Sequence, residues 1–230
     1  MNDGTKDDFR CNLPKIIVGR HGRTVSNRDG RIMGGSDSPL ILDGVQTAKE
    51  LALILADEQI SAIFSSHLGR AAFTASIYSE KLNIPIYFRP SLAELSAGCW
   101  EKEYRCSVRG DLLTLRDSWL DRPPGGESYQ DAEFRIKSFL KEISAGKSEG
   151  SLLVVGHAGV NRVFLKLLLN IEPCLAITTS FPHDLVYAIE NQGEIRYRTS
   201  KDSSGRGLLL EAHGLTGDHQ RCHGNLFQGH

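Results

Sequence analysis

The chain has 230 residues, of which 40% are hydrophobic and 24% charged, a composition that suits one globular domain with a full core. Its 27 Lys and Arg residues nearly balance 28 Asp and Glu residues, which excludes a global field that would attract nucleic acid or an anionic membrane. No stretch approaches the ~20 apolar residues of a membrane span, and the acidic N-terminus does not resemble a secretory signal. The five cysteines are scattered without a CxxC pair, so we expect reduced thiols in a cytoplasmic protein.

Apolar runs alternate with helical patterns along most of the chain. Residues 1–14 are expected to form a flexible leader, and residues 15–201 to form the domain. Strands are predicted at residues 15–19, 60–64, 84–88, 152–155, 185–190 and 195–199. Helices are predicted at residues 43–56, 67–81, 129–143 and 160–169. This alternation is typical of an α/β fold, a three-layer sandwich with a mostly parallel central sheet flanked by helices.

Particular residues mark the ends and faces of these elements. Asp43 is a plausible N-cap for the first helix, and Phe134 falls on the apolar face of the third. The stretch 203–207 has a loop composition, and residues 202–230 are expected to form a loosely ordered tail. The tail contains four histidines and one cysteine, but their spacing matches no recognised zinc pattern.

Two glycine-flanked histidines follow predicted strands far apart in the sequence. Arg20-His21-Gly22 ends the first strand, and Gly156-His157-Ala158 ends the strand at 152–155. Ligands of parallel sheets usually bind beyond the carboxyl ends of the strands, so the two histidines indicate one shared site. An arginine beside a histidine suits phosphate chemistry, because its guanidinium can fix a dianion while the imidazole attacks phosphorus.

Further blocks follow in a recognisable order. They are Arg23-Thr24 with Asn27, Asp43-Gly44, Ser65-Ser66-His67-Leu68 with Arg70, Leu92-Ala93-Glu94-Leu95, Trp100-Glu101, Pro124-Gly125-Gly126-Glu127-Ser128, and Gly156-His157-Ala158-Gly159 with Arg162. This order and spacing resemble the histidine phosphatase superfamily, the clan of phosphoglycerate mutases and related phosphatases. The resemblance extends from about residue 15 to residue 190.

The resemblance implies a role for each matched residue. It makes His21 the nucleophile that forms a phosphohistidine, Glu94 the general acid, and His157 a further catalytic group. The implied phosphate-binding residues are Arg20, Asn27, Arg70 and His157. Glu101 and Glu127 are other carboxylates in matched blocks, and we interpret His183 as structural. Arg20 and Arg70 would lower the pKa of His21, and the N-terminus of the helix after His157 would offer a dipole to an anion.

Residues that depart from the family pattern or flank the site are candidates for the rim of the pocket, where the substrate would be contacted. The rim candidates are Arg23, Ser26, Met33 and Tyr104, and the same reasoning adds His67, Arg105 and Arg109. Arg23 could equally face solvent. Their cationic bias suggests a second anionic group on the ligand, which suits a phosphorylated carboxylate, a sugar bisphosphate or a nucleotide.

The function implied is a metal-independent phosphomonoesterase that hydrolyses a small phosphorylated metabolite. The alternatives are a cofactor-dependent phosphoglycerate mutase and a non-catalytic member that binds a phosphorylated ligand. The short segment at residues 102–123 favours an open pocket and hence hydrolysis. We expect no cofactor and no metal, a small-molecule phosphomonoester as partner, no nucleic acid and no membrane; a homodimer is an expectation drawn from the family.

Overall fold

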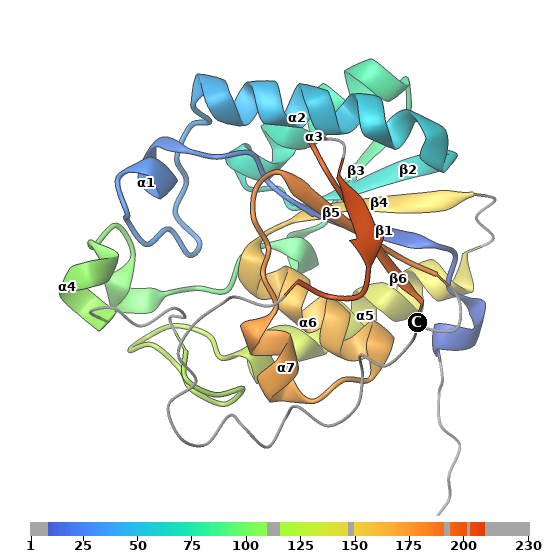
Figure 1. The fold of residues 1–230 in the computed structure, drawn as a ribbon. Helices are drawn as coiled ribbons and strands as arrows, with labels where there is room; N and C mark the ends of the chain where they lie inside the picture. The colour runs from blue at the N-terminus through green and yellow to red at the C-terminus, as the bar shows by residue number, and fades with distance from the viewer. Residues whose placement is uncertain (1–8, 110–115, 147–149, 191–193, 202, 210–230) are drawn as a thin grey trace, which may run out of the picture.

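The computed structural model describes residues 9–109, 116–146, 150–190, 194–201 and 203–209 (Figure 1). The expectations for residues 1–8 of the leader and 210–230 of the tail lie outside these residues. Within the described part of the chain, no helix is both long enough and apolar enough to cross a membrane.

A seven-stranded sheet runs through the middle of the domain in the order β3-β2-β4-β1-β5-β6-β7. The strands are β1 Ile16–Arg20, β2 Ile60–Ser65, β3 Ile86–Phe88, β4 Ser151–Gly156, β5 Leu185–Ile189, β6 Ile195–Thr199 and β7 Ser204–Arg206. The four strands β3, β2, β4 and β1 pair in parallel, whereas β5, β6 and β7 extend the sheet by antiparallel pairings. The parallel core confirms the predicted α/β fold class.

Helices cover both faces of this sheet, so the fold has the three expected layers (Figure 1). The α-helices are α1 Val25–Arg28, α2 Leu42–Leu55, α3 Gly69–Leu82, α4 Arg105–Arg109, α5 Tyr129–Ala145, α6 Ala158–Leu169 and α7 Pro173–Thr178. Short 3-10 helices are η1 Phe9–Asn12, η2 Ala56–Glu58, η3 Pro90–Leu92 and η4 Gly98–Trp100. Helices α2 and α3 lie together on one face, and α5 and α6 pack against each other on the opposite face.

The alternation of side chains along β1 explains how both helical layers are held. Ile16 and Val18 belong to the core cluster formed with α5 and α6, whereas Ile17 belongs to the cluster formed with α2 and α3. Because successive side chains of a strand point to opposite faces, one apolar run supplies both cores. This requirement accounts for the continuous apolar composition of β1 and β4.

Several sequence-based expectations for the elements are wrong in detail. The N-cap of α2 is Ile41, and Asp43 lies inside the first turn, where its charge still favours the helix dipole. Phe134 is 72% exposed on α5 and does not join the core. Residues Ser204–Arg206, expected to be a loop, form β7 because the antiparallel pairing with β6 satisfies their backbone groups.

The leader and the cysteines also differ from expectation where the structure describes them. Residues 9–12 of the expected leader form η1, and Leu13 is buried in the core beside α5. Cys174 is disulfide-bonded, so the expectation of reduced thiols is wrong for this residue, whereas Cys99 and Cys106 are free and exposed. Scattered spacing along the sequence carries no information on which cysteines the fold brings together.

Gly44, at the start of α2, packs closely against the backbone of the chain that follows β1, and this contact can be tested. A Cβ placed on Gly44 would lie 2.3 Å from the backbone oxygen of Arg23, so Gly44→Ala forces α2 and the chain after His21 apart. We expect this variant to lower the free energy of unfolding by about 1–3 kcal/mol, measured by urea denaturation. Gln46→Ala, at an exposed position of the same helix, should change it by less than about 0.5 kcal/mol. Equal stability of the two variants would contradict this packing.

Candidate functional site

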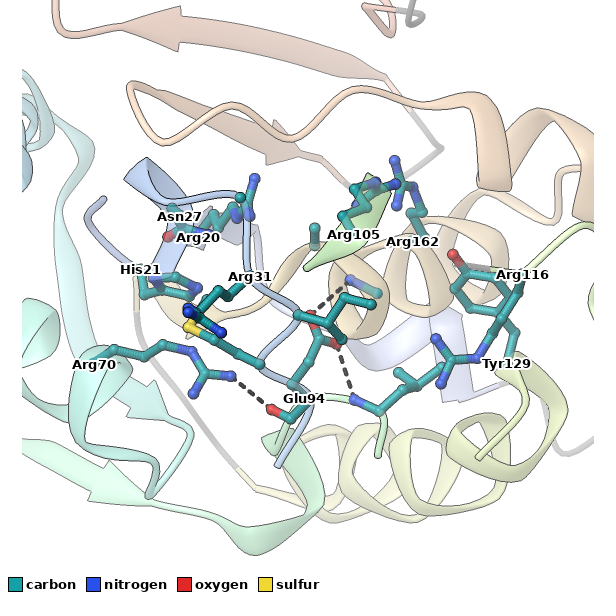
Figure 2. Close-up of a pocket in the computed structure, with 17 residues that line it drawn as sticks. Arg20, His21, Asn27, Arg31, Arg70, Glu94, Arg105, Arg116, Tyr129 and Arg162 are labelled. Atoms are coloured by element: carbon teal, nitrogen blue, oxygen red, sulfur yellow. Dashed lines mark hydrogen bonds between the residues drawn. The ribbon is translucent and has the colours of Figure 1, made fainter. Parts of the chain in front are cut away.

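A cavity of about 250 Å³ opens beyond the carboxyl ends of the parallel strands, and Figure 2 shows the 17 residues that line it. Its charged lining consists of Arg20, Arg31, Arg70, Arg105, Arg116, Arg162 and Glu94. His21 and Asn27 also line it, and His157 lies just behind, in contact with the ring of His21. The cavity is therefore strongly cationic and adjoins both histidines of the two strand-end motifs.

Strand pairing brings the two histidines together. Arg20 lies opposite Gly156 in the parallel pairing of β1 with β4, and the N–H of His21 donates to the Gly156 carbonyl at 3.0 Å. The next residue on each strand is a histidine, and the two ring centroids are 5.2 Å apart. The prediction that both motifs share one site is confirmed by this geometry.

A single hydrogen bond sets the tautomer of His21. Its Nδ1 lies 2.8 Å from the backbone oxygen of Gly22. A carbonyl oxygen can only accept, so Nδ1 carries the proton and the lone pair of the neutral ring is on Nε2. Burial lowers the pKa of His21 well below its usual value, and the nearby His157 and Arg20 lower it further. The ring is therefore neutral at physiological pH and holds an unprotonated nitrogen.

His157 is fully buried at the N-terminal end of α6. Among the described residues, neither of its ring nitrogens has a hydrogen-bond partner. Burial lowers the pKa of His157 well below its usual value, and the charges of Arg70 and Arg20 lower it further. A neutral imidazole without a partner can donate a hydrogen bond to an oxyanion that enters beside His21.

Arg20, Arg70 and Asn27 flank His21, as the sequence predicts (Figure 2). The Arg20 guanidinium donates to the Phe181 carbonyl at 2.9 Å. The Arg70 guanidinium donates to the carbonyls of Gly34 and Ser36, which hold it in one orientation. The side-chain oxygen of Asn27 accepts from the backbone of Thr24, so its amide nitrogen is the group that it can offer to a ligand.

Glu94 occupies the N-terminus of α6. Its carboxylate accepts three backbone N–H groups, those of Leu95, Gly159 and Val160. We expected this helix end to offer its dipole to a bound anion, but the anion there is the carboxylate of Glu94 itself. A Cβ on Gly159 would lie 2.6 Å from Glu94 Oε1, so this close approach requires glycine.

The two other carboxylates of the matched blocks hold loops together. Glu101 accepts the backbone N–H groups of Gly35, Ser36 and Ala97. Glu127 accepts the N–H of Ser96 at 2.8 Å and lies near Arg135. Neither lines the cavity, whereas Glu94 does. The geometry therefore favours Glu94 among the three candidates for an acid.

His183 contacts the nucleophile from the other side. Its Nδ1–H donates to the backbone oxygen of His21 at 2.7 Å, and the two rings are 5.2 Å apart. Burial and the charge of Arg20 lower the pKa of His183 to about 3. The sequence analysis interpreted His183 as structural. It did not predict that His183 holds the backbone of His21 in place.

The predicted rim residues divide between the cavity lining and the surface outside it. Met33 lines the cavity, as does Arg105. Arg23 is exposed and lies 3.9 Å from Asp43, and Ser26 in α1 donates its backbone N–H to the hydroxyl of Ser38; neither residue lines the cavity. Tyr104 lies outside the lining, under the Arg31 guanidinium at 3.9 Å from the ring centroid. Exposed His67 does not line the cavity either, and the side chain of Arg109 lies outside the described atoms.

Four lining residues with polar side chains have no role in the sequence-based site: Arg31, Arg116, Tyr129 and Arg162. A signal for Arg162 was present, because it follows Ala158 by one helical turn and so shares the cavity face of α6. Arg116 and Tyr129 had no such signal. Arg116 belongs to no motif, and its position depends on contacts with the carbonyls of Glu127 and Ser96.

Comparisons with known proteins agree with the motifs. A family model described as the histidine phosphatase superfamily (branch 1) matches residues 16–193. A relative from Escherichia coli (strain K12), named adenosylcobalamin/alpha-ribazole phosphatase, is 27% identical over 156 residues, which are 66% of this chain and 77% of that protein. A protein of Enterobacter sp. (strain 638), named "Probable phosphoglycerate mutase GpmB", is 34% identical over 148 residues, covering 62% of this chain and 69% of that protein.

A solved structure shares the fold. The mycobacterial glucosyl-3-phosphoglycerate phosphatase, solved in complex with VO3, superposes with a TM-score of 0.69. The superposition covers 86% of this chain and 100% of that chain, at 22% sequence identity. At that identity the likeness establishes the common architecture, with strands and helices in the same arrangement.

Three histidines with lowered pKa values predict how stability depends on pH. In the unfolded chain, each of these histidines takes up a proton as the pH falls through about 6.5. In the folded state, the lowered pKa values keep His21, His157 and His183 neutral. Stability is therefore full above pH 6.5 and is lost as the pH falls, by up to ~1.4 kcal/mol per pH unit for each histidine. Urea denaturation between pH 7.5 and 5.5 measures this loss, because most carboxylates stay ionised in that window.

Two variants isolate the contribution of one ring. His183→Gln should reduce the loss of stability between pH 7.5 and 5.5 by about 1 kcal/mol. His67→Gln, at an exposed histidine, should leave the loss unchanged. A pH dependence that is the same in both variants would contradict the assignment of a neutral His183 in the folded protein.

Proposed function

Because the chain belongs to the histidine phosphatase superfamily, we propose that it is a metal-independent phosphomonoesterase acting through a phosphohistidine on His21. The observation that carries this proposal is the state of the His21 ring. Its Nδ1–H is held by the Gly22 carbonyl, and its low pKa leaves Nε2 with a lone pair beside a cavity lined by six arginines. A small phosphorylated metabolite is the substrate that fits a cavity of about 250 Å³.

The first step transfers the phosphoryl group to the enzyme. The lone pair on His21 Nε2 attacks phosphorus, and the bond from phosphorus to the ester oxygen breaks. The leaving oxygen takes a proton from Glu94, whose carboxyl group lines the same cavity. Arg20, Arg70 and the amide of Asn27 would stabilise the charge on the phosphoryl oxygens, and the buried His157 would donate to one of them.

The second step returns the enzyme to its starting state. Glu94, now a carboxylate, takes a proton from water as the water oxygen attacks the phosphohistidine. The phosphorus–nitrogen bond breaks, its electron pair returns to Nε2, and inorganic phosphate leaves. Three backbone N–H groups hold the carboxyl group of Glu94 in place for both steps.

A phosphoglycerate mutase is the second candidate, and the 34% identity to a protein named as such favours it. A mutase would use the same His21, Arg20, Arg70 and Glu94, but its phosphohistidine would pass to a second substrate hydroxyl rather than to water. The two reactions therefore differ in the acceptor of the phosphoryl group. Primed assays with 3-phosphoglycerate and its bisphosphate separate them.

The nucleophile is tested by hydrolysis of p-nitrophenyl phosphate in excess chelator. We expect the native protein to release phosphate and His21→Ala to lose at least ~10⁴-fold in kcat, because the substitution removes the lone pair that attacks phosphorus. His67→Ala, which removes an exposed histidine, is the matched control and should retain full activity. Hydrolysis by His21→Ala at a near-native rate would refute the phosphohistidine.

The role of Glu94 is tested by the nature of the leaving group. Glu94→Gln should lower kcat by about 10²–10⁴-fold for an alkyl phosphate such as glycerol 3-phosphate, because an alkoxide must be protonated to leave. The loss should be smaller for p-nitrophenyl phosphate, whose phenolate leaves readily. Glu127→Gln changes a carboxylate that also accepts a backbone N–H but does not line the cavity. An equal loss for both substrates would argue against proton donation by Glu94.

A further inference from the structure

The backbone carbonyl of Gly22 determines which nitrogen of His21 can attack. Its oxygen lies 2.8 Å from His21 Nδ1 and therefore holds the ring proton there. If this carbonyl turned away, the neutral ring would exchange its proton between Nδ1 and Nε2, and the Nε2–H form has no lone pair on Nε2. The reactivity of the nucleophile thus depends on the direction of one carbonyl group.

Gly22 cannot fix that direction by its own conformational preference. Glycine adopts a wider range of backbone angles than any other residue. A residue with a side chain is excluded here, because a Cβ on Gly22 would lie 2.7 Å from the backbone oxygen of Gly44. Contacts from other parts of the chain must therefore hold the backbone at this point.

The peptide group between His21 and Gly22 is held at both of its polar ends. Nδ1–H of His183 donates to the His21 carbonyl at 2.7 Å. The N–H of Gly22 donates to Oγ1 of Thr74 at 2.9 Å. The C=O and N–H of a trans peptide point in opposite directions, so these two bonds prevent the peptide plane from rotating. A fixed plane here limits where the next carbonyl, that of Gly22, can point.

Thr74 and His183 are connected in turn to the phosphate-binding arginines. Thr74 is fully buried on α3, one turn after Arg70, and its hydroxyl donates to the Arg70 carbonyl at 2.7 Å. That bond uses the hydroxyl hydrogen, so a lone pair is left to accept the peptide N–H. Two residues before His183, the Phe181 carbonyl accepts from the Arg20 guanidinium at 2.9 Å. The nucleophile and both arginines therefore share one connected network.

We propose that His183 and Thr74 are positioning residues for the nucleophile: they hold the peptide after His21 so that the next carbonyl keeps the ring proton on Nδ1 and the lone pair stays on Nε2. The inference rests on the proposed function, in which Nε2 attacks phosphorus. Neither His183 nor Thr74 lines the cavity, so each acts through His21 and not through contact with the substrate.

Two amide variants at position 183 separate this role from the loss of the imidazole ring. The amide nitrogen of Asn is attached at the same carbon as Nδ1 of histidine, whereas the longer Gln side chain places its amide nitrogen near the position of Nε2. His183→Asn can therefore donate to the His21 carbonyl from the native position, and His183→Gln cannot. We expect kcat for p-nitrophenyl phosphate to be about tenfold lower in His183→Gln than in His183→Asn, the effect of one lost hydrogen bond. Equal kcat values would overturn the role of His183.

A second matched pair tests the other end of the peptide. Thr74→Ser keeps the hydroxyl, whereas Thr74→Val keeps the shape of the side chain and loses the bond to Gly22. We expect kcat of Thr74→Val to be at least about tenfold below that of Thr74→Ser. Equal kcat values would overturn the role of Thr74. The two amide variants at position 183 keep the inference testable if Thr74→Val does not fold.

Nitrogen-15 NMR of the histidine rings tests the cause of these effects without any substrate. The signals of His21 are identified by their absence from the spectrum of His21→Ala. We expect Nδ1 to carry the proton in the native protein and in His183→Asn, and part of the His21 population to carry it on Nε2 in His183→Gln. Exposed His67→Gln is the control and should leave the His21 signals unchanged.

The NMR result also separates this inference from the proposed function. An unchanged proton position on His21 in both His183→Gln and Thr74→Val would overturn the inference, even if kcat falls, because a purely structural role would lower kcat without moving the proton. The expected proton positions together with no hydrolysis of any ester by the native protein would overturn the proposed function and leave the positioning role standing.

Discussion

The parallel pairing of β1 with β4 is the constraint on which the site depends. Both strands end at the same level, with Arg20 opposite Gly156, so the histidine that follows each strand emerges beside the other. Strand β5 pairs with the other edge of β1 in the antiparallel sense, so the chain that enters β5 arrives where β1 ends. His183 reaches the backbone of His21 for that reason. Three histidines thus meet at one point because of strand direction alone.

Electrostatics then decides what these groups can do. Burial next to arginines keeps the imidazoles of His21 and His157 neutral. A neutral ring can act as a nucleophile or as a hydrogen-bond donor, but it cannot bind phosphate through a positive charge. Positive charge is left to the guanidinium groups, which stay protonated when buried. The carboxylate takes the end of α6, where three N–H groups hold it at a fixed place in the cavity. Gly159 makes this possible, since any side chain there would occupy the space of the carboxylate.

Periodicity and motif order predicted the parts of the molecule that are local in sequence. The apolar runs that became β1, β4 and β5 were predicted to within about two residues, because burial on both faces leaves an uninterrupted apolar signal. Phe134 shows the limit of that signal, since an apolar residue at the edge of a helical stripe can still face solvent.

The site divides in the same way. Arg20, His21, Asn27, Arg70 and Glu94 belong to motifs and lie at the cavity, as predicted. Arg116 and His183 could not be assigned from the sequence, because each owes its place to a carbonyl group far away in the chain. Tyr104 was assigned to the wrong role for a related reason: it supports Arg31 instead of facing the ligand. The segment between α7 and β5 carries this logic furthest, since Thr179 holds Arg162, Phe181 holds Arg20, and His183 holds His21. A substitution anywhere along this segment would therefore disturb ligand binding and the orientation of His21 together.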